Sequence, residues 1–222
     1  MKVRRIANWV CAFFLVVGFV IVSSRWIDQP LSKYLFTHFE LRSAFEHAHV
    51  DLPIMLIIAA ICVVGGGVYW FWCGQWAKAV AVGTASGLAL LLSGCLVSVL
   101  LKPLFARAVP VVFLAGGGYG FHWLHGGDGL DSFPSGHSAQ MAAVLSVLWT
   151  YYPRARWGYL AIFAALAGSL IVGQWHFLSD TVAGGFVGAL VGQLTILVAR
   201  ALKILPGASC VVSEQWPGAP PE

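Results

Sequence analysis

Charged residues are scarce in this chain. Only 10% of its 222 residues are Asp, Glu, Lys or Arg, whereas soluble domains carry roughly 25%. The net charge of +4 is small, and it gives little support to a role in nucleic-acid binding. With a hydrophobic content of 59%, this scarcity argues against an ordinary soluble domain and indicates an integral membrane protein.

A metal-ligand set is also missing. The five cysteines show none of the spacings typical of structural metal sites, and most lie in apolar segments, where we expect small buried side chains. They are Cys11, Cys62, Cys73, Cys95 and Cys210. His38, His47 and His49 gather in the loop 25–52, but no cysteine or carboxylate completes a ligand set, so we interpret them as solvated interfacial residues. We expect neither a metal nor a cofactor.

What the chain has instead is long apolar segments. Six reach the length of a membrane-crossing helix, about 17–25 residues. They run roughly over residues 8–24, 54–72, 79–101, 135–152, 157–176 and 181–199. They predict an all-α polytopic membrane protein with six transmembrane helices in one bundle. This domain covers residues 1–204, and the proline-rich tail 205–222 is expected to be disordered.

Two shorter patterns add detail to this bundle. Phe36, Phe39, Leu41 and Phe45 could form the apolar face of a helix that lies at the membrane interface. Glycines at 184, 188 and 192 recur every fourth residue. In lipid, such spacing lets helix backbones approach closely, and we expect tight packing there.

Lys and Arg are distributed unequally between the two ends of the six segments. With a cytoplasmic N-terminus, eight of the 13 fall on the cytoplasmic side and five on the other. The positive-inside rule then places both termini in the cytoplasm. The loop 102–134, the start of the fourth segment and the turn 176–180 share the outer face, which is periplasmic in a bacterial inner membrane. An inverted protein would still keep these three segments together.

Polar residues cluster at the ends of these segments. One cluster is Ser132-Phe133-Pro134-Ser135-Gly136-His137, and the other is His176-Phe177-Leu178-Ser179-Asp180. Polar residues at such positions in a membrane protein mark functional sites. The first cluster opens a predicted helix, whose unpaired N–H groups and positive dipole end attract anions. Gly136 permits close approach of the backbone to a ligand.

The second cluster pairs a histidine with a carboxylate. His176 and Asp180 are four residues apart, so a helical turn places both on one face. Asp180 could then hydrogen-bond one imidazole nitrogen, fix the tautomer and leave the other nitrogen free to attack. Lys102 and Arg107 supply positive charge on the same side as His137. The set predicts phosphoryl transfer without metal, in which one histidine is the nucleophile and the other protonates the leaving oxygen.

At these residues the sequence resembles the type-2 phosphatidic acid phosphatase superfamily. That family's pattern has three blocks, Lys-x6-Arg-Pro, Pro-Ser-Gly-His and Ser-Arg-x5-His-x3-Asp. The second block is complete at 134–137, and the third runs from Ser169 to Asp180 with leucine in its second position. The six-segment layout also matches, so the resemblance covers most of the chain from Ala79 to Arg200.

The resemblance implies a role for each matching residue. His176 would accept the phosphate, Asp180 would orient the His176 ring, and His137 would be the general acid. The implied activity is a membrane lipid phosphatase that hydrolyses a lipid phosphomonoester or pyrophosphate through a phosphohistidine. It suggests phosphatidate, phosphatidylglycerophosphate, undecaprenyl pyrophosphate or the lipid A phosphates as substrates. The expected phosphate-binding residues are Lys102, Arg107, Ser135 and Gly136.

Two arginines of the family pattern are absent. Val109 and Leu170 stand in their places, and Arg107, two residues before the first, could partly substitute. Arginines there would hold phosphate oxygens through forked contacts, and losing one such contact can cost on the order of 10²–10³ in rate. Three alternatives stay open: a phosphatase re-tuned for another substrate, a phosphotransferase that passes the phosphate to a lipid hydroxyl, and a weakly active or non-catalytic lipid-binding protein. The retained histidines and aspartate favour catalysis.

The loop 111–131 is rich in glycine and contains His122 and His125. It could be a mobile lid over a lipid headgroup, or an ordinary flexible connection. Either histidine could supply a replacement contact to the phosphate.

Overall fold

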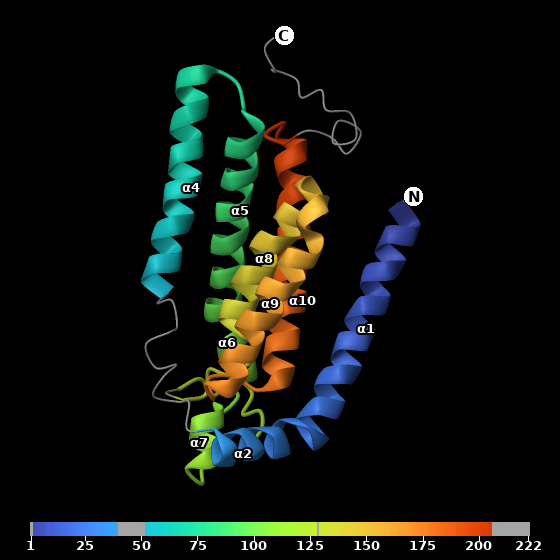
Figure 1. Cartoon of the computed structure of the whole chain (residues 1–222), viewed down its shortest axis with the longest axis vertical. Helices are drawn as coiled ribbons and strands as arrows, with labels where there is room; N and C mark the ends of the chain where they lie inside the picture. Colours follow the sequence, from blue (N-terminus) through green and yellow to red (C-terminus); the bar gives the residue numbers. More distant parts are fainter. Residues whose placement is uncertain (1, 40–51, 128, 206–222) are drawn as a thin grey trace.

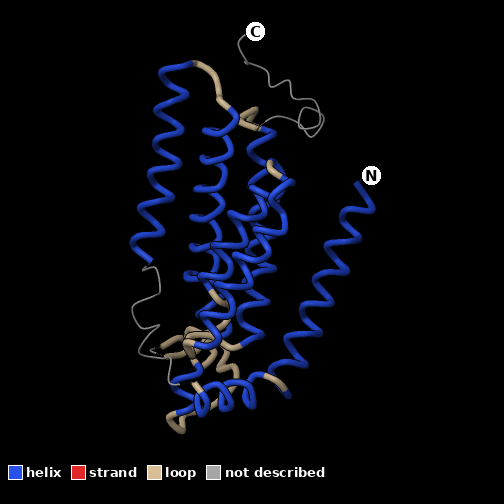
Figure 2. Tube along the Cα trace, viewed as in Figure 1, coloured by secondary structure: helices blue, strands red, loops and turns tan. Residues whose placement is uncertain are grey.

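The secondary structure is helical. The computed structural model describes residues 2–39, 52–127 and 129–205. Helices and turns account for this part of the chain (Figure 2), apart from two isolated β-bridges at Arg107. The all-α prediction is therefore confirmed for the described residues. The predicted tail lies outside them from residue 206 onward.

The helices follow the apolar segments of the sequence and add short helices between them. In chain order they are α1 (Lys2–Trp26), α2 (Asp28–His38), α4 (Leu52–Cys73), α5 (Lys78–Cys95), the π-helical segment η1 (Leu96–Leu101), α6 (Lys102–Phe105), α7 (Pro110–Leu114), α8 (Gly136–Tyr151), the 3₁₀ turn η2 (Pro153–Ala155), α9 (Arg156–Val172) and α10 (Leu178–Ala201).

Five helical stretches are long and apolar enough to cross a membrane within the described residues. They are Ile6–Trp26, Ile54–Cys73, Lys78–Phe105, Pro153–Val172 and Leu178–Ala201. The predicted segment 135–152 forms α8, which has only 16 residues. At 1.5 Å per residue it is roughly 24 Å long, shorter than a hydrocarbon core of about 30 Å. The chain is thus an all-helical membrane bundle, and the predicted number of six spans is not confirmed.

The short helix α8 lies at the centre of the bundle (Figure 1) and packs mainly against α10 and α5. Its contact with α10 depends on the predicted glycine series. A Cβ at Gly184 would overlap the backbone of Ser135, and one at Gly188 would overlap the backbone of Ala139. The expected tight packing is confirmed, and it brings the starts of α8 and α10 together.

The outer helices α1 and α4 present large apolar side chains to the surroundings. Three of the four described cysteines are also exposed. Cys11, Cys73 and Cys95 are exposed and Cys62 is half-buried, so the expectation of buried cysteines is wrong for these four. An exposed position on a bundle in lipid is still an apolar one, which accounts for the difference. Cys210 lies outside the described residues.

The polar segments lie at one end of the bundle. Helices α2, α6 and α7, the start of α8, the end of α9 and the start of α10 lie together, opposite the end at which α10 finishes (Figure 1). The predicted gathering of these segments on one face is confirmed.

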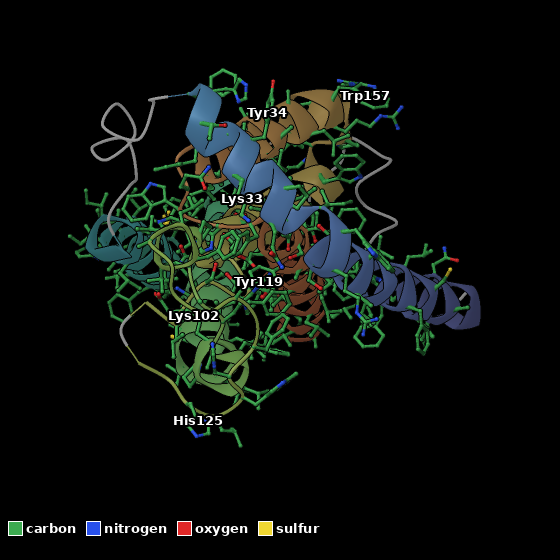
Figure 3. All side chains as sticks on the ribbon, turned by 90° about the horizontal axis from the view of Figure 1, so that it is seen from below. Lys33, Tyr34, Lys102, Tyr119, His125 and Trp157 are labelled. Atoms are coloured by element: carbon green, nitrogen blue, oxygen red, sulfur yellow. The ribbon has the colours of Figure 1, made fainter. Side chains whose placement is uncertain are left out.

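Helix α2 crosses this end of the molecule (Figure 3). Phe36 and Phe39 are exposed along it, as expected of an interfacial helix, whereas Asp28 and Ser32 are buried against the bundle. The other residues of the predicted apolar face, Leu41 and Phe45, lie outside the described residues. His47 and His49 also lie outside them.

Candidate active site

A cavity of ≈ 390 Å³ opens at the polar end of the bundle. It holds three residues of the predicted site together with both positions that lack the family arginines. Its lining residues are Lys102, Val109, Val111, Asp131, His137, Leu170, Gln174, Trp175 and His176. Among the residues that the structure describes, no group of three or more His, Cys, Asp or Glu is placed to hold a metal ion.

The His176 ring is buried in the wall of this cavity. Its Nδ1 lies 2.9 Å from the carbonyl oxygen of Ser132. A carbonyl can only accept, so Nδ1 carries the hydrogen and Nε2 keeps the lone pair. The nearest oxygen of Asp180 is 3.9 Å from Nδ1, beyond hydrogen-bond distance. Instead of the predicted bond to Asp180, Nδ1 of His176 donates to the backbone carbonyl of Ser132.

The environment of His176 keeps the ring neutral. Burial lowers its pKa to about 3, and the nearby positive charge of Lys102 and the His137 ring act in the same direction. The hydrogen bond to Ser132 opposes this shift only in part. A neutral imidazole with a free lone pair is the form that a nucleophile requires.

The Asp180 carboxylate organises the start of α10. Its Oδ2 accepts from the hydroxyl of Ser132 at 2.5 Å and from the backbone N–H of Phe177 at 2.8 Å. Its Oδ1 lies 2.5 Å from Nη1 of Arg107. Asp180 therefore caps α10 and fixes Ser132, and through Ser132 it acts on His176.

Helix α8 begins where the sequence predicts. Ser135 is its N-cap, and the Ser135 hydroxyl accepts from the N–H of Ser138 at 3.3 Å. The N–H of Ser135 donates to the carbonyl of Asp180 at 3.0 Å. Ser135 is fully buried and does not line the cavity, whereas His137 in the first turn of α8 does line it.

Arg107 does not line the cavity. It is fully buried, and Nη1 donates to Asp180 at 2.5 Å and to Ser179 at 2.6 Å. Nη2 donates to Asp28 at 2.8 Å and to the hydroxyl of Tyr119 at 2.7 Å. Two carboxylates occupy its forked donors, so the predicted phosphate contact of Arg107 has no support in this arrangement.

Arg107 instead joins α2, the loop before α8 and the start of α10. Its guanidinium lies 4.5 Å from the ring centroid of Phe177 and 5.0 Å from that of Phe121. Asp28, its partner on α2, also accepts from the hydroxyl of Ser23 at 2.7 Å. Asp28 was not among the predicted site residues. In the sequence it stands out only as a carboxylate shortly after the first apolar segment.

The loop after α7 is held in place in its described part. The N–H of His122 donates to the carbonyl of Ala106 at 3.0 Å, and the N–H of Val109 donates to Gly129 at 2.9 Å. Four aromatic rings pack together beneath it, those of Phe105, Phe121, Trp123 and Phe133. These contacts favour a fixed loop over a mobile lid.

The loop histidines lie away from the cavity. Neither His122 nor His125 lines it, and Figure 3 shows His125 at the outer edge of the loop, apart from Lys102. Hydrogen bonds from His125 to the carbonyls of Trp123 and His122 raise its pKa. A replacement phosphate contact from either histidine has no support in this arrangement.

Lys102 and Asp131 form an ion pair in the cavity lining. Nζ of Lys102 lies 3.2 Å from Oδ2 of Asp131, and the Asp131 side chain is 59% exposed. Two further lining residues, Gln174 and Trp175, directly precede His176 and were missed by sequence analysis. Their only signal was that position.

Part of this chain is similar in sequence to known proteins. Residues 82–203 match the PAP2 superfamily. A lipid A 1-phosphatase of Rhizobium johnstonii is 33% identical over 99 residues, 45% of this chain and 41% of the relative. A lipid A 1-phosphatase of Rhizobium etli is 32% identical over 99 residues, 45% of this chain and 43% of the relative. The chain therefore matches less than half of the length of these relatives.

A solved structure has a similar fold. It is the crystal structure of the first transmembrane PAP2 type phosphatidylglycerolphosphate phosphatase from Bacillus subtilis. The TM-score is 0.52 at 19% identity, and the similarity covers 87% of this chain and 96% of that chain.

Proposed function

This chain belongs to the PAP2 superfamily, and from that premise we propose that it is a membrane lipid phosphatase that works through a phosphohistidine. The observation that carries the proposal is the state of His176. Its Nδ1 is bonded to the carbonyl of Ser132, its ring is neutral, and it lines a cavity that also contains His137 and Lys102.

The proposed reaction has two steps. Nε2 of His176 attacks phosphorus, the bond from phosphorus to the lipid oxygen breaks, and His137 gives that oxygen a proton. Water then attacks the phosphohistidine while His137 takes its proton, which releases phosphate and restores both rings. Lys102 and the N-terminal turn of α8 stabilise the charge that develops on the phosphate oxygens.

Lipid A 1-phosphate is the first substrate to test, because both curated relatives carry that activity in their names. Phosphatidylglycerophosphate is the second, on the name of the solved structure. Phosphatidate and undecaprenyl pyrophosphate complete the panel that the family resemblance suggests. In each case the reacting group is a phosphate on a lipid that lies at the membrane surface.

Helix α8 is the sixth membrane span in this proposal. It runs from the polar end of the bundle towards the opposite end (Figure 1), and its packing against α10 and α5 supports it. A central helix covered by its neighbours does not need to match the lipid thickness. Six spans put both termini on one side, and the distribution of Lys and Arg makes that side the cytoplasm. The cavity then faces the periplasm of a bacterial inner membrane.

The decisive experiment is phosphate release from the lipid panel by the purified full chain in detergent, with EDTA present. We expect wild type to release phosphate and the His176→Ala variant to release none. Loss of activity under EDTA that a divalent ion restores would contradict the metal-free mechanism. No release from any of the lipids would contradict the proposed function.

A further inference from the structure

The carboxamide of Gln174 is an unused donor beside the proposed nucleophile. Gln174 is 3% exposed and lines the cavity two residues before His176. Its Oε1 accepts from the hydroxyl of Ser32 on α2 at 2.7 Å. Its Nε2 has no hydrogen-bond partner among the described residues.

The backbone at this residue is also unusual. Gln174 has φ 59°, in the left-handed region that residues other than glycine seldom occupy. Strained conformations of this kind persist where the surrounding structure enforces them, and they concentrate at functional sites. The turn 173–177 therefore holds the Gln174 side chain at a fixed place in the wall beside His176.

Gln174 also borders a second cavity, of ≈ 130 Å³. The other residues that line it are Phe36, Val111, Leu114 and Ala115. Those side chains are apolar. A buried donor without an acceptor destabilises the fold, so the missing partner is best supplied by a molecule that enters the larger cavity.

The same wall lacks two cationic donors that the family pattern has. Val109 and Leu170, which stand at the family arginine positions, line the cavity together with Gln174. Lys102 is the cation that remains in the lining, and Asp131 is paired with it. A phosphate in this cavity consequently meets fewer charged donors than the family pattern provides, and a neutral N–H donor is present.

We propose that Nε2 of Gln174 donates a hydrogen bond to a phosphate oxygen of the bound substrate, and that Ser32 orients the amide for this contact. The inference rests on the proposed function, since it assigns a phosphate-binding residue to that site. Nε2 is buried, so its contact with a phosphate requires a small movement of the cavity lining.

Ser32 sets which end of the amide faces the phosphate. Its hydroxyl donates to Oε1, and this leaves the N–H end for the ligand. An amide turned the other way would present an oxygen and repel the anion. Helix α2, which lies outside the matched family region 82–203, thereby contributes to the site.

The test measures binding of inorganic phosphate to the full chain in detergent, from the concentration dependence of the melting temperature. Gln174→Met removes the donor at similar size, and we expect the Kd for phosphate to rise about tenfold or more. Gln174→Glu keeps an acceptor for Ser32 but places an oxygen at the phosphate, so its Kd should rise further. Ser32→Ala should raise the Kd severalfold, because the amide loses its orienting bond.

Gln193→Met is the matched control. The Gln193 amide is half-buried and donates to Ser146 and Thr150 on α8, but it lies about 22 Å along α10 from the start of that helix. Its Kd for phosphate should equal that of wild type. Equal phosphate binding by Gln174→Met and Gln193→Met would overturn the inference. If Gln174→Met does not fold, unchanged binding by Ser32→Ala and Gln174→Glu would overturn it equally.

The readout separates this inference from the proposed function. If wild type released no phosphate from any lipid, the proposed function would fail, yet a weaker phosphate affinity in Gln174→Met would still support the contact. If wild type were active and Gln174→Met raised the KM for the lipid without changing the Kd for inorganic phosphate, Gln174 would recognise another part of the headgroup. The inference would then be wrong and the proposed function would stand.

Discussion

Nδ1 of His176 is bonded to the carbonyl oxygen of Ser132 at 2.9 Å, whereas Asp180 lies 3.9 Å from the same nitrogen. A backbone carbonyl cannot take the proton from the ring, so it fixes the tautomer without competing for the proton. Asp180 controls this arrangement indirectly, because its carboxylate holds the Ser132 hydroxyl and caps the helix that follows His176.

The indirect role of Asp180 predicts a graded series of variants. His176→Ala should abolish turnover with the melting temperature near wild type. Asp180→Asn should lower kcat by about tenfold to hundredfold, the usual effect of a residue that orients another, and should also lower the melting temperature, because Arg107 loses a charged partner. Ser132→Ala keeps the carbonyl, so its loss of kcat should be smaller. A kcat of zero for Asp180→Asn with unchanged stability would show a direct chemical role.

Arg107 and Lys102 should behave in opposite ways. Arg107→Gln breaks two fully buried ion pairs, to Asp28 and Asp180, and losing one partner of a buried pair typically costs about 3–5 kcal/mol. We expect a large fall in melting temperature and poor recovery from the membrane. Lys102→Gln should keep the melting temperature but weaken phosphate binding, since Lys102 lines the cavity. A stable Arg107→Gln with weakened phosphate binding would restore Arg107 as a ligand.

Much of the architecture could be predicted from sequence because hydrophobic length and helix-start chemistry are local signals. The apolar segments located the long helices, and Pro134 to Gly136 located the start of α8. The positions of Val109 and Leu170 also proved informative, because both line the cavity. The meeting of separate segments at one membrane face could also be predicted, because consecutive membrane-crossing helices run in opposite directions.

The rest depended on long-range packing. The bond from His176 to Ser132 involves a backbone carbonyl, which leaves no trace in the residue types. The buried pair of Arg107 with Asp28 joins residues 79 positions apart, and it requires α2 to fold across the end of the bundle. The predicted number of six spans stays a prediction, because α8 has only 16 residues and lies at the centre of the bundle, where a helix can be shorter than the membrane is thick.

The pH dependence follows from the lowered pKa of His176. With a pKa of about 3, the ring stays neutral as the pH falls from 8 to 5. Trapped phosphohistidine in a single-turnover, rapid-quench experiment should therefore not decrease as the pH falls across that range. A histidine with an ordinary pKa near 6.5 would lose about nine tenths of its neutral form by pH 5.5. A loss of trapped intermediate centred near pH 6.5 would contradict the burial argument.

The same shift requires a stability control. The folded-state pKa lies below the unfolded value, so the unfolded chain binds a proton on His176 below about pH 6.5 and the folded state does not. The contribution to stability is therefore present above that pH and is lost as the pH falls. Melting temperatures should be measured at each pH, so that unfolding is not mistaken for titration of the nucleophile.

Topology can be tested with two single cysteines in a cysteine-free background. Gly118 and Ala155 are both exposed, one in the loop before α8 and one directly after it. Gly118→Cys should react with an impermeant reagent added outside, and Ala155→Cys should be protected until the membrane is permeabilised. The reverse pattern would invert the orientation. Equal labelling of both would show that α8 does not cross the membrane.

The two missing arginines provide the most demanding prediction. Val109 and Leu170 both line the cavity, and Leu170 is only 4% exposed. Val109→Arg with Leu170→Arg would place two large cations beside Lys102 in a wall that offers them little solvation. If the cavity has been re-tuned for its own lipid, these side chains crowd the substrate, and turnover on that lipid should fall.

The alternative explanation is simple decay of a phosphate site, and it predicts the opposite result. Restored arginines would then raise kcat/KM on the native lipid, because forked donors strengthen with the charge of the transition state. The double variant should be compared with Val109→Leu and Leu170→Met, which keep the wall apolar at similar size. We expect re-tuning, since His176 and the residues that orient it are intact. A double variant more active than wild type on the native lipid, with both apolar controls unchanged, would show that the site had only lost charge.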